Sequence, residues 1–108
     1  MLRTQQNFTG DTPIFITENG MANADIITPD GVLDSARIDY LNKHLHSVYQ
    51  ALDQGVPIKG YFVWSLLDNY EWSFGYEKRF GIVHVDFDTL KRTPKASYYA
   101  LANMLGNA

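Results

Sequence analysis

The sequence predicts an α/β protein in which a helix joins two parallel strands. Two apolar segments, residues 14–17 and 58–65, are rich in β-branched and aromatic residues and indicate buried strands. Between them, residues 35–54 carry apolar side chains at helical spacing. A helix of this length between two apolar strands is typical of a βαβ unit in a parallel sheet whose two faces are both covered.

Length and composition favour one small domain with a hydrophobic core, because 45% of the 108 residues are hydrophobic. Nine basic and twelve acidic residues give a net charge of −3, so we expect no nucleic-acid partner. The absence of cysteine excludes a disulfide framework and a thiolate metal site. The sequence shows no signal-peptide pattern and no apolar run that could span a bilayer, so a cytoplasmic protein without a membrane partner is expected.

The first strand is preceded by a mostly polar segment and followed by an acid. Within residues 1–12, Leu2 and Phe8 suggest the end of a helix before a Gly-Asp-Thr turn. The strand itself covers residues 14–17, and Glu18 comes directly after it, followed by Asn-Gly, which turns the chain. A carboxylate at the end of a buried strand needs charge-stabilising partners and is usually functional. For an isolated Glu-Asn-Gly, a side chain pointing into water would be the simpler interpretation.

The long helix has a clear beginning and end. After the turn Thr28–Gly31, either Asp34 or Ser35 can cap its first turn, and Gly55 ends it just after Gln54. Spacings of three and four residues predict a buried stripe, made of Ile38, Leu41, Leu45, Val48 and Leu52.

The second strand, residues 58–65, is apolar almost throughout. Gly60 within it indicates a tight bend or a close approach of another group to the backbone. The following loop, residues 66–79, holds more aromatic and acidic side chains than packing requires. Residues 81–87 predict a further short strand.

A last helix is expected to open at Thr93–Pro94, a cap followed by an N1 proline, and to end at Gly106. Its predicted buried stripe consists of Tyr98, Leu101, Ala102 and Leu105.

Both strands deliver polar or aromatic groups at their carboxyl ends: Glu18 after the first, and Trp64 with the acidic loop after the second. That arrangement is typical of a parallel α/β barrel, in which the loops after the strands build the active site. Carboxylates beside tryptophans favour a sugar site, because indoles stack on a pyranose and carboxylates accept bonds from its hydroxyls. The sequence has no serine nucleophile elbow, phosphate-binding loop or zinc motif, so other catalytic templates find no support.

Five segments carry a resemblance to a known family: residues 16–20 (ITENG), 37–41 (RIDYL), 60–72 (GYFVWSLLDNYEW), 78–81 (KRFG) and 92–95 (RTPK). They resemble glycoside hydrolase family 1, the β-glucosidase family of retaining enzymes. The resemblance implies a (β/α)₈ TIM barrel of about 250 residues or more. It implies that residues 1–108 are a single partial domain, the C-terminal quarter of that barrel, with strands 7 and 8 and their helices.

The resemblance also implies residue roles. Glu18 resembles the catalytic nucleophile, Glu71 the acceptor of hydrogen bonds from the outer sugar hydroxyls, and Trp72 its neighbour that donates to the sugar. Trp64 resembles the platform under the sugar ring and Phe80 a residue of the same pocket, although core packing would also explain these two. The implied partner is a β-glycoside or oligosaccharide, with no metal and no cofactor.

Other charged residues of the long loop have simpler interpretations. Asp68 and Asn69 are expected to organise the loop rather than to act in catalysis, and residues 77–79 (Glu-Lys-Arg) are expected to form a solvated charge cluster.

One departure from the family is large. A retaining glycosidase needs a second carboxyl group about 5 Å from the nucleophile as acid/base, and the family takes it from an Asn-Glu-Pro motif that this sequence does not contain. Two interpretations therefore remain open: part of a larger retaining β-glycosidase that lacks the acid/base, or a non-catalytic remnant that keeps part of a sugar-binding surface. In both cases the chain by itself is expected to be inactive.

Overall fold

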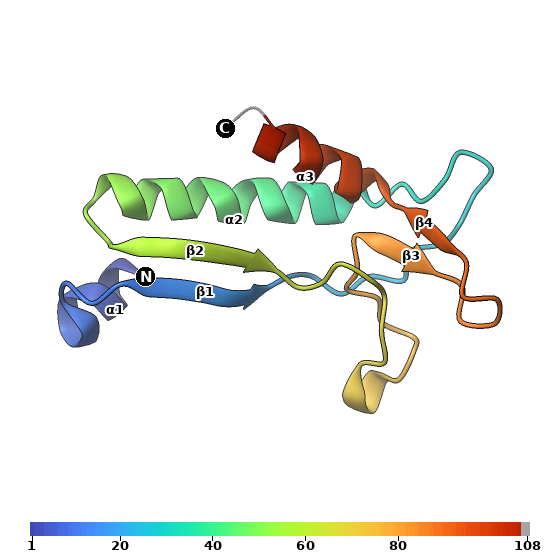
Figure 1. The fold of residues 1–108 in the computed structure, drawn as a ribbon, viewed down its shortest axis with the longest axis horizontal. Coiled ribbons are helices and arrows are strands. Elements are labelled where there is room, and N and C mark those ends of the chain that lie inside the picture. The colour runs from blue at the N-terminus through green and yellow to red at the C-terminus, as the bar shows by residue number, and fades with distance from the viewer. Residues whose placement is uncertain (107–108) are drawn as a thin grey trace.

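The computed structural model describes residues 1–106 and contains the predicted strand–helix–strand unit (Figure 1). Its elements in chain order are α1 (Leu2–Thr4), the π-helical turn η1 (Gln5–Thr9), β1 (Ile14–Asn19), α2 (Ser35–Asp53), β2 (Ile58–Val63), the 3₁₀ turn η2 (Trp72–Phe74), β3 (Val83–Val85), β4 (Arg92–Pro94) and α3 (Ala96–Gly106).

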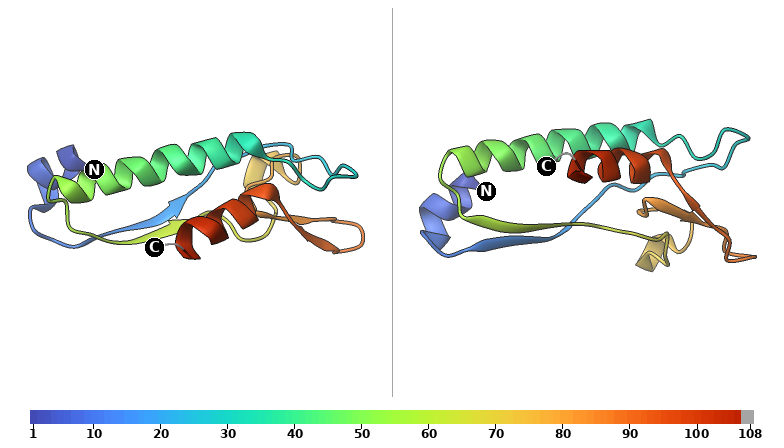
Figure 2. Two further views of the ribbon diagram at one scale, coloured as in Figure 1. Left: turned by 90° about the horizontal axis from the view of Figure 1, so that it is seen from above. Right: turned by 45° about the horizontal axis from the view of Figure 1, so that its top comes forward.

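The predicted parallel pairing is confirmed, because β1 and β2 form a two-stranded parallel sheet with α2 as the crossover. α2 runs alongside the sheet and α3 packs against α2, while the β3–β4 hairpin lies beyond the carboxyl ends of the two parallel strands (Figures 1 and 2). No helix within residues 1–106 is long and apolar enough to cross a bilayer.

The expectation that both faces of the sheet are covered is wrong for these residues. The molecule measures 47 × 34 × 18 Å, so its thin dimension is close to the depth of one helix on one sheet. The helices pack on the side of Ile14, Ile16 and Ile58, whereas Phe15 and Phe62 on the opposite face are 56% and 58% exposed. Strand sequences suited to a doubly covered sheet are therefore covered on one face only.

Two clusters form the core. One lies where α2 meets the start of the strands and contains Ala51, Val56 and Ile58, with Leu2, Ile14, Ile16 and Val48 packed against them. The other joins both long helices to the hairpin and contains Ile82, Val83 and Leu101, with Leu45, Val63, Leu67 and Met104 around them. In the stripe predicted for α2, Leu41 is fully buried but Leu52 is exposed, because Ala51 faces the strands instead. Leu2 joins the core as part of α1, whereas Phe8 is exposed.

Predictions for one turn and two glycines are confirmed. Thr28 and Gly31 close their turn with two backbone hydrogen bonds of 2.9 and 3.0 Å. Gly55 follows α2 with φ +89°, a conformation that favours glycine. A Cβ atom on Gly60 would lie 2.6 Å from the ring of Phe15, so this glycine allows the close approach that was expected.

The start of the last helix was predicted wrongly. Thr93 and Pro94 belong to β4, which pairs antiparallel with β3, and α3 begins only at Ala96. A proline is tolerated there because it ends a short edge strand. The side chain of Asp34 caps α3: it accepts hydrogen bonds from the Ser97 amide at 2.9 Å and from the Ser97 hydroxyl at 2.5 Å. At the start of α2 itself, Asp34 makes no side-chain capping bond.

The stripe predicted for α3 is correspondingly shifted. Leu101 is buried as expected, but Tyr98, Ala102 and Leu105 are exposed. Ser97 and Met104 lie on the inner face with Leu101, because two hydrogen bonds to the buried Asp34 hold Ser97 against the core. The strand expected over residues 81–87 is shorter than predicted and is limited to β3.

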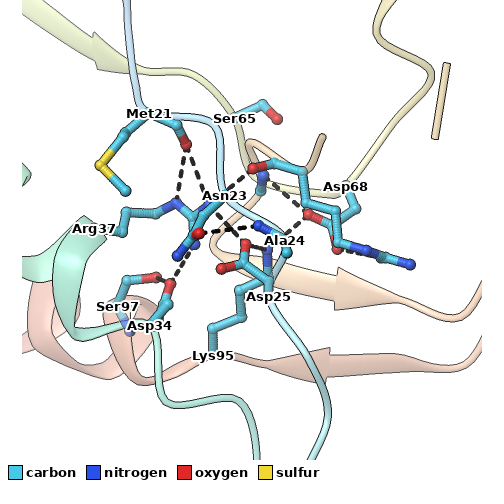
Figure 3. A network of polar contacts seen from close by, with 12 residues as sticks. Met21, Asn23, Ala24, Asp25, Asp34, Arg37, Ser65, Asp68, Lys95 and Ser97 are labelled. Carbon is cyan, nitrogen blue, oxygen red and sulfur yellow. Dashed lines mark hydrogen bonds and ion pairs between the residues drawn. The ribbon is translucent and has the colours of Figure 1, made fainter. Parts of the chain in front are cut away.

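A network of buried charges joins the loops at the carboxyl ends of β1 and β2 (Figure 3). Lys95 bridges Asp25 and Asp68 at 2.6 and 2.7 Å, and Arg37 bridges Asp25 and Asp34 at 2.6 and 2.5 Å. Arg79 completes the set with a 2.7 Å contact to Asp68. Three carboxylates therefore face three cations, and burial is tolerable because every charge has a partner.

Of the two carboxylates that Lys95 bridges, Asp68 is the more completely bonded. Besides its two cations, Asp68 accepts bonds from the Gly81 amide at 3.1 Å and from the Val85 amide at 3.2 Å. Burial by itself would raise the pKa of Asp68, but hydrogen bonds from Lys95 and Arg79 outweigh it and hold that pKa below its usual value. Burial likewise opposes the charge of Arg37, whose pKa is nevertheless raised by Asp25 and Asp34.

Replacing Lys95 by methionine should lower the free energy of unfolding by about 3–5 kcal/mol, because it removes the cation shared by two buried carboxylates. The measurement is denaturant unfolding of parent and variant, both carried in the chimaeric protein that is described under Proposed function. Lys43→Met is the matched control, since Lys43 pairs with Asp39 at the surface of α2, and its effect should be about 0.5 kcal/mol or less. Equal effects of the two substitutions would contradict a structural role for the network.

Asp68 should also make the protein sensitive to acid. Because its folded-state pKa lies below the ordinary value of 3.8, its contribution to stability is complete above about pH 4 and is lost as the pH falls through the folded-state pKa. Asp68→Asn should lower stability at neutral pH and flatten the decline in thermal midpoint below pH 4. An acid decline as steep in Asp68→Asn as in the parent would show that other groups cause it.

Candidate active site

One cleft at the carboxyl ends of β1 and β2 contains every residue that the sequence singled out for the site. It has a volume of about 450 Å³ and is lined by Glu18, Asn19, Gly20, Trp64, Glu71, Trp72 and Phe80. These residues come from two strand ends and from the loop after β2, so parallel pairing is what brings them together. A concave site of several hundred Å³ with aromatic walls and a few polar groups suits a small organic ligand.

Glu18 belongs to β1 itself rather than to the turn after it. Ile16 pairs with Tyr61 and Asn19 with Val63, so three steps along β1 match two along β2 and one extra residue is accommodated at Thr17–Glu18. Such a bulge changes the direction in which a side chain points. Glu18 is exposed in the cleft, and its side chain forms no hydrogen bond or ion pair with any residue of 1–106. The stabilising partners expected for this carboxylate are therefore not among the described residues.

The two strand ends lie in direct contact. The Trp64 amide donates to the Asn19 carbonyl at 2.9 Å, and the following peptide bond, Trp64–Ser65, is cis. A Cβ atom on Gly20 would lie only 1.8 Å from the carbonyl oxygen of Trp64. Glycine at this position is thus required for the close packing of the two strand ends that form the floor of the cleft.

Glu71 and Trp72 reach the cleft from a tight turn. The Glu71 amide donates to Gly75 at 2.7 Å, and the Phe74 amide donates to Glu71 at 2.9 Å. Trp72 has φ +46°, a left-handed conformation that is uncommon for a large side chain and is often found at functional sites. Its side chain is 84% exposed, and Glu71 is half-buried. The indole is therefore available to a ligand rather than used in packing.

The base of this loop is held by the buried charges. Asp68 binds the Gly81 amide, and Phe80 accepts a hydrogen bond from the Ser65 amide at 3.1 Å. Asp68 thus organises the loop, as predicted. The expectation for residues 77–79 is wrong in part, because Arg79 bonds to Asp68 and to the Val85 carbonyl at 2.8 Å, whereas Glu77 and Lys78 are exposed.

Sequence reasoning missed the residues that support the cleft from below. Arg37 and Lys95 lie in the RIDYL and RTPK segments that carried the family resemblance, but nothing in their spacing indicates that they meet. Asp25 gave no signal, because it follows no recognisable turn pattern. A buried basic residue is inferred from its partners in space, and these are 70 and 27 residues away in the chain for Lys95.

The cleft offers two carboxylates and two indole rings but no metal site, since no group of three or more metal-ligating side chains occurs within residues 1–106. A second cavity of about 430 Å³ lies between α1, α2 and the strands, and its wall includes Ile16, Asn19, His44 and Tyr61. Asn19 lines both cavities.

Comparison with protein families gives one match along almost the whole chain. The model of Glycosyl hydrolase family 1 matches residues 1–107. Beta-glucosidase A of Thermotoga maritima is 55% identical over 95 residues, which are 87% of this chain and 21% of that protein. A bifunctional beta-D-glucosidase/beta-D-fucosidase of Bifidobacterium breve is 47% identical over 103 residues, which are 91% of this chain and 22% of the relative. A 6-phospho-beta-galactosidase of Streptococcus mutans is 48% identical over 99 residues, which are 92% and 21% of the two chains.

Solved structures agree with the sequence comparison. The family 1 β-glucosidase of Thermotoga maritima in complex with isofagomine lactam superposes with a TM-score of 0.93 and 49% identity, covering 97% of this chain and 24% of that one. The chain therefore spans about a fifth to a quarter of the length of the relatives and structures that it matches. The names of these relatives differ in the sugar and in its phosphorylation, and all three describe a β-glycosidase.

Gly20→Ala should disrupt the cleft, because the added methyl group would overlap the Trp64 carbonyl and force the two strand ends apart. We expect a loss of stability of about 1–3 kcal/mol in denaturant unfolding, measured with this chain in place of the matching segment of the Thermotoga maritima β-glucosidase. Gly106→Ala is the matched control, since a Cβ atom there meets nothing within 4 Å, and it should be neutral. A Gly20→Ala variant as stable as the control would show that the strand ends tolerate separation.

Proposed function

Because the chain belongs to glycosyl hydrolase family 1, we propose that it provides the nucleophile and part of the sugar-binding surface of a retaining β-glycosidase. In this proposal residues 1–108 form one partial domain, which contributes strands 7 and 8 of a (β/α)₈ barrel, and the remaining strands complete the substrate site. The observation that carries the proposal is the convergence of Glu18, Glu71 and two indole rings on one cleft at the carboxyl ends of parallel strands.

Glu18 is the proposed nucleophile. One of its carboxylate oxygens forms a bond to the anomeric carbon while the bond from that carbon to the leaving oxygen breaks, and the leaving oxygen takes a proton from a second carboxyl group. Water, deprotonated by that second group, then releases the sugar and restores the Glu18 carboxylate. The exposure of Glu18 in the cleft supports this role, since a nucleophile needs access to the substrate.

The other cleft residues would bind and orient the sugar. Glu71 is proposed to accept hydrogen bonds from the outer hydroxyls, and the Trp72 indole N–H can donate one. Trp64 offers an aromatic face to the ring, with Phe80 beside it. The proposed substrate is a β-glycoside or an oligosaccharide.

The alternative is a non-catalytic remnant with a partial sugar-binding surface. The number of glutamates favours this alternative. Besides Glu18 and Glu71 the chain contains one more glutamate, Glu77, and Glu77 does not line the cleft. An acid/base at the required distance would then have to come from residues beyond this chain. The sequence of the gene upstream of Met1 distinguishes the two: an in-frame Asn-Glu-Pro strand supports the enzyme.

The proposed nucleophile can be tested in a chimaera in which this full chain replaces the matching segment of the Thermotoga maritima β-glucosidase. Glu18→Gln should lower hydrolysis of nitrophenyl β-glucoside at least roughly 10³-fold while substrate binding persists, because the amide cannot form the glycosyl-enzyme. A 2-fluoro-glycoside that traps this intermediate should label the peptide containing Glu18, as read by mass spectrometry.

Glu77→Gln is the control for this experiment. Glu77 is an exposed glutamate of the same loop region that does not line the cleft, so its replacement should leave the rate unchanged. Label on Glu71 or Glu77 would refute the assignment of the nucleophile.

The isolated chain 1–108 should be neither active nor a cooperative monomer. Phe15 and Phe62 are exposed on an uncovered sheet face, and the outer edges of β1 and β2 have free backbone groups that recruit other strands. Because the isolated chain lacks a general acid, it should hydrolyse a β-glucoside about 10²- to 10⁴-fold more slowly than the chimaera does. The measurements are light scattering after size-exclusion chromatography and an aryl β-glucoside assay. An active monomer with a cooperative thermal transition would contradict both parts.

A further inference from the structure

We propose that the Tyr61 hydroxyl is a positioning group for Glu18, acting through the side chain of Asn19; the inference rests on the nucleophile role proposed above. Tyr61 donates a hydrogen bond of 2.6 Å to the Asn19 Oδ1 atom, and both residues are partly buried. Asn19 follows Glu18 directly in β1. Tyr61 itself does not line the cleft, so it does not act on the sugar.

The β-bulge in β1 explains why Glu18 needs such a support. Between the Ile16–Tyr61 pair and the Asn19–Val63 pair, one extra residue of β1 is left without a partner in the ladder. Regular pairing would fix the backbone at Glu18, whereas a bulged segment depends on the anchors on either side of it. A freely varying backbone would leave the carboxylate oxygen imprecisely placed.

Tyr61 connects the two sides of this bulge. Its backbone pairs with Ile16 before the bulge, and its hydroxyl binds Asn19 after it. The Trp64 amide holds the carbonyl of Asn19 from the other strand end. Asn19 is thereby fixed through its main chain and its side chain, and the orientation of Glu18 between Ile16 and Asn19 is restricted.

The hydroxyl that binds Asn19 belongs to a residue outside the cleft. Tyr61 lies in the wall of the cavity between α1, α2 and the strands, and Asn19 separates this cavity from the cleft. Burial, with a smaller contribution from Tyr40, raises the pKa of Tyr61 above its ordinary value of 10.0, so the phenol stays a donor at neutral pH. A ligand of the cleft can therefore come and go without breaking the bond.

The test uses the active chimaera and the variant Tyr61→Phe, which removes one oxygen atom and keeps the ring. We expect kcat to fall roughly 10- to 100-fold, the effect of a displaced reacting group, with KM within about twofold. The rate of labelling by the 2-fluoro-glycoside should fall by the same factor, because that step also uses Glu18. Tyr49→Phe is the control, since Tyr49 is an exposed tyrosine of α2 that lines neither cavity, and it should leave kcat unchanged.

Asn19→Ala gives an independent variant if Tyr61→Phe does not fold. Because both substitutions break the same bond, the double variant should be no slower than the slower single variant. Additive losses in kcat would overturn the proposal.

The outcomes separate this inference from the function on which it rests. Suppose that the parent is active and Glu18→Gln is inactive. If Tyr61→Phe then has an unchanged kcat, counted per site that the 2-fluoro-glycoside labels, the positioning role is overturned and the nucleophile assignment stands. A loss of thermal stability without a loss of kcat would overturn it as well, since a purely structural bond predicts that pattern. Full activity of Glu18→Gln would instead refute the proposed function.

Discussion

The contact of Lys95 with two buried aspartates is the interaction on which the loop end of the molecule depends. A fully buried ammonium group is tolerated only when its charge is compensated, and here Asp25 and Asp68 do so from the loops after β1 and β2. Arg37 and Arg79 extend the network to α2 and to the base of the aromatic loop. Since removal of one partner leaves uncompensated charges, segments far apart in sequence are held together as one unit.

This network of buried charges holds the segments that form the walls of the cleft. Asp68 fixes the amide of Gly81, and the Ser65 amide binds the carbonyl of Phe80, so the segment after the loop is joined to the residue that follows Trp64. Asp34, bonded to Arg37, also caps α3 and so connects the last helix to the same unit. The residues that line the cleft are thus placed by charged side chains that do not line it themselves.

The sequence was sufficient for the features that depend on local patterns. Two apolar segments separated by a helix predicted the parallel pair, and Glu18, Trp64 and Glu71 could be selected from the family resemblance before the cleft was seen. The sequence was insufficient for features that depend on contacts between residues far apart in the chain. Asp34 or Ser35 was expected to cap α2, yet the carboxylate of Asp34 binds Ser97, 63 residues later. The bulge at Glu18 was also invisible, because register between strands is a property of the pair and not of one segment.

The loop end of the molecule and its strands differ in how well their side chains are packed. At the loop end, buried charges are paired and turns are closed by hydrogen bonds, so the segments that carry the residues lining the cleft are held in place by contacts within the described chain. Along the strands, Phe15 and Phe62 lie on an uncovered face although their sequences suit burial. In the proposed enzyme, a segment organised in this way would hold the Glu18 carboxylate in place, while the rest of the barrel would provide the apolar contacts that stabilise it. The two kinds of contact have different effects. Ion pairs with directional hydrogen bonds specify the positions of side chains, whereas burial of apolar area provides most of the free energy of folding.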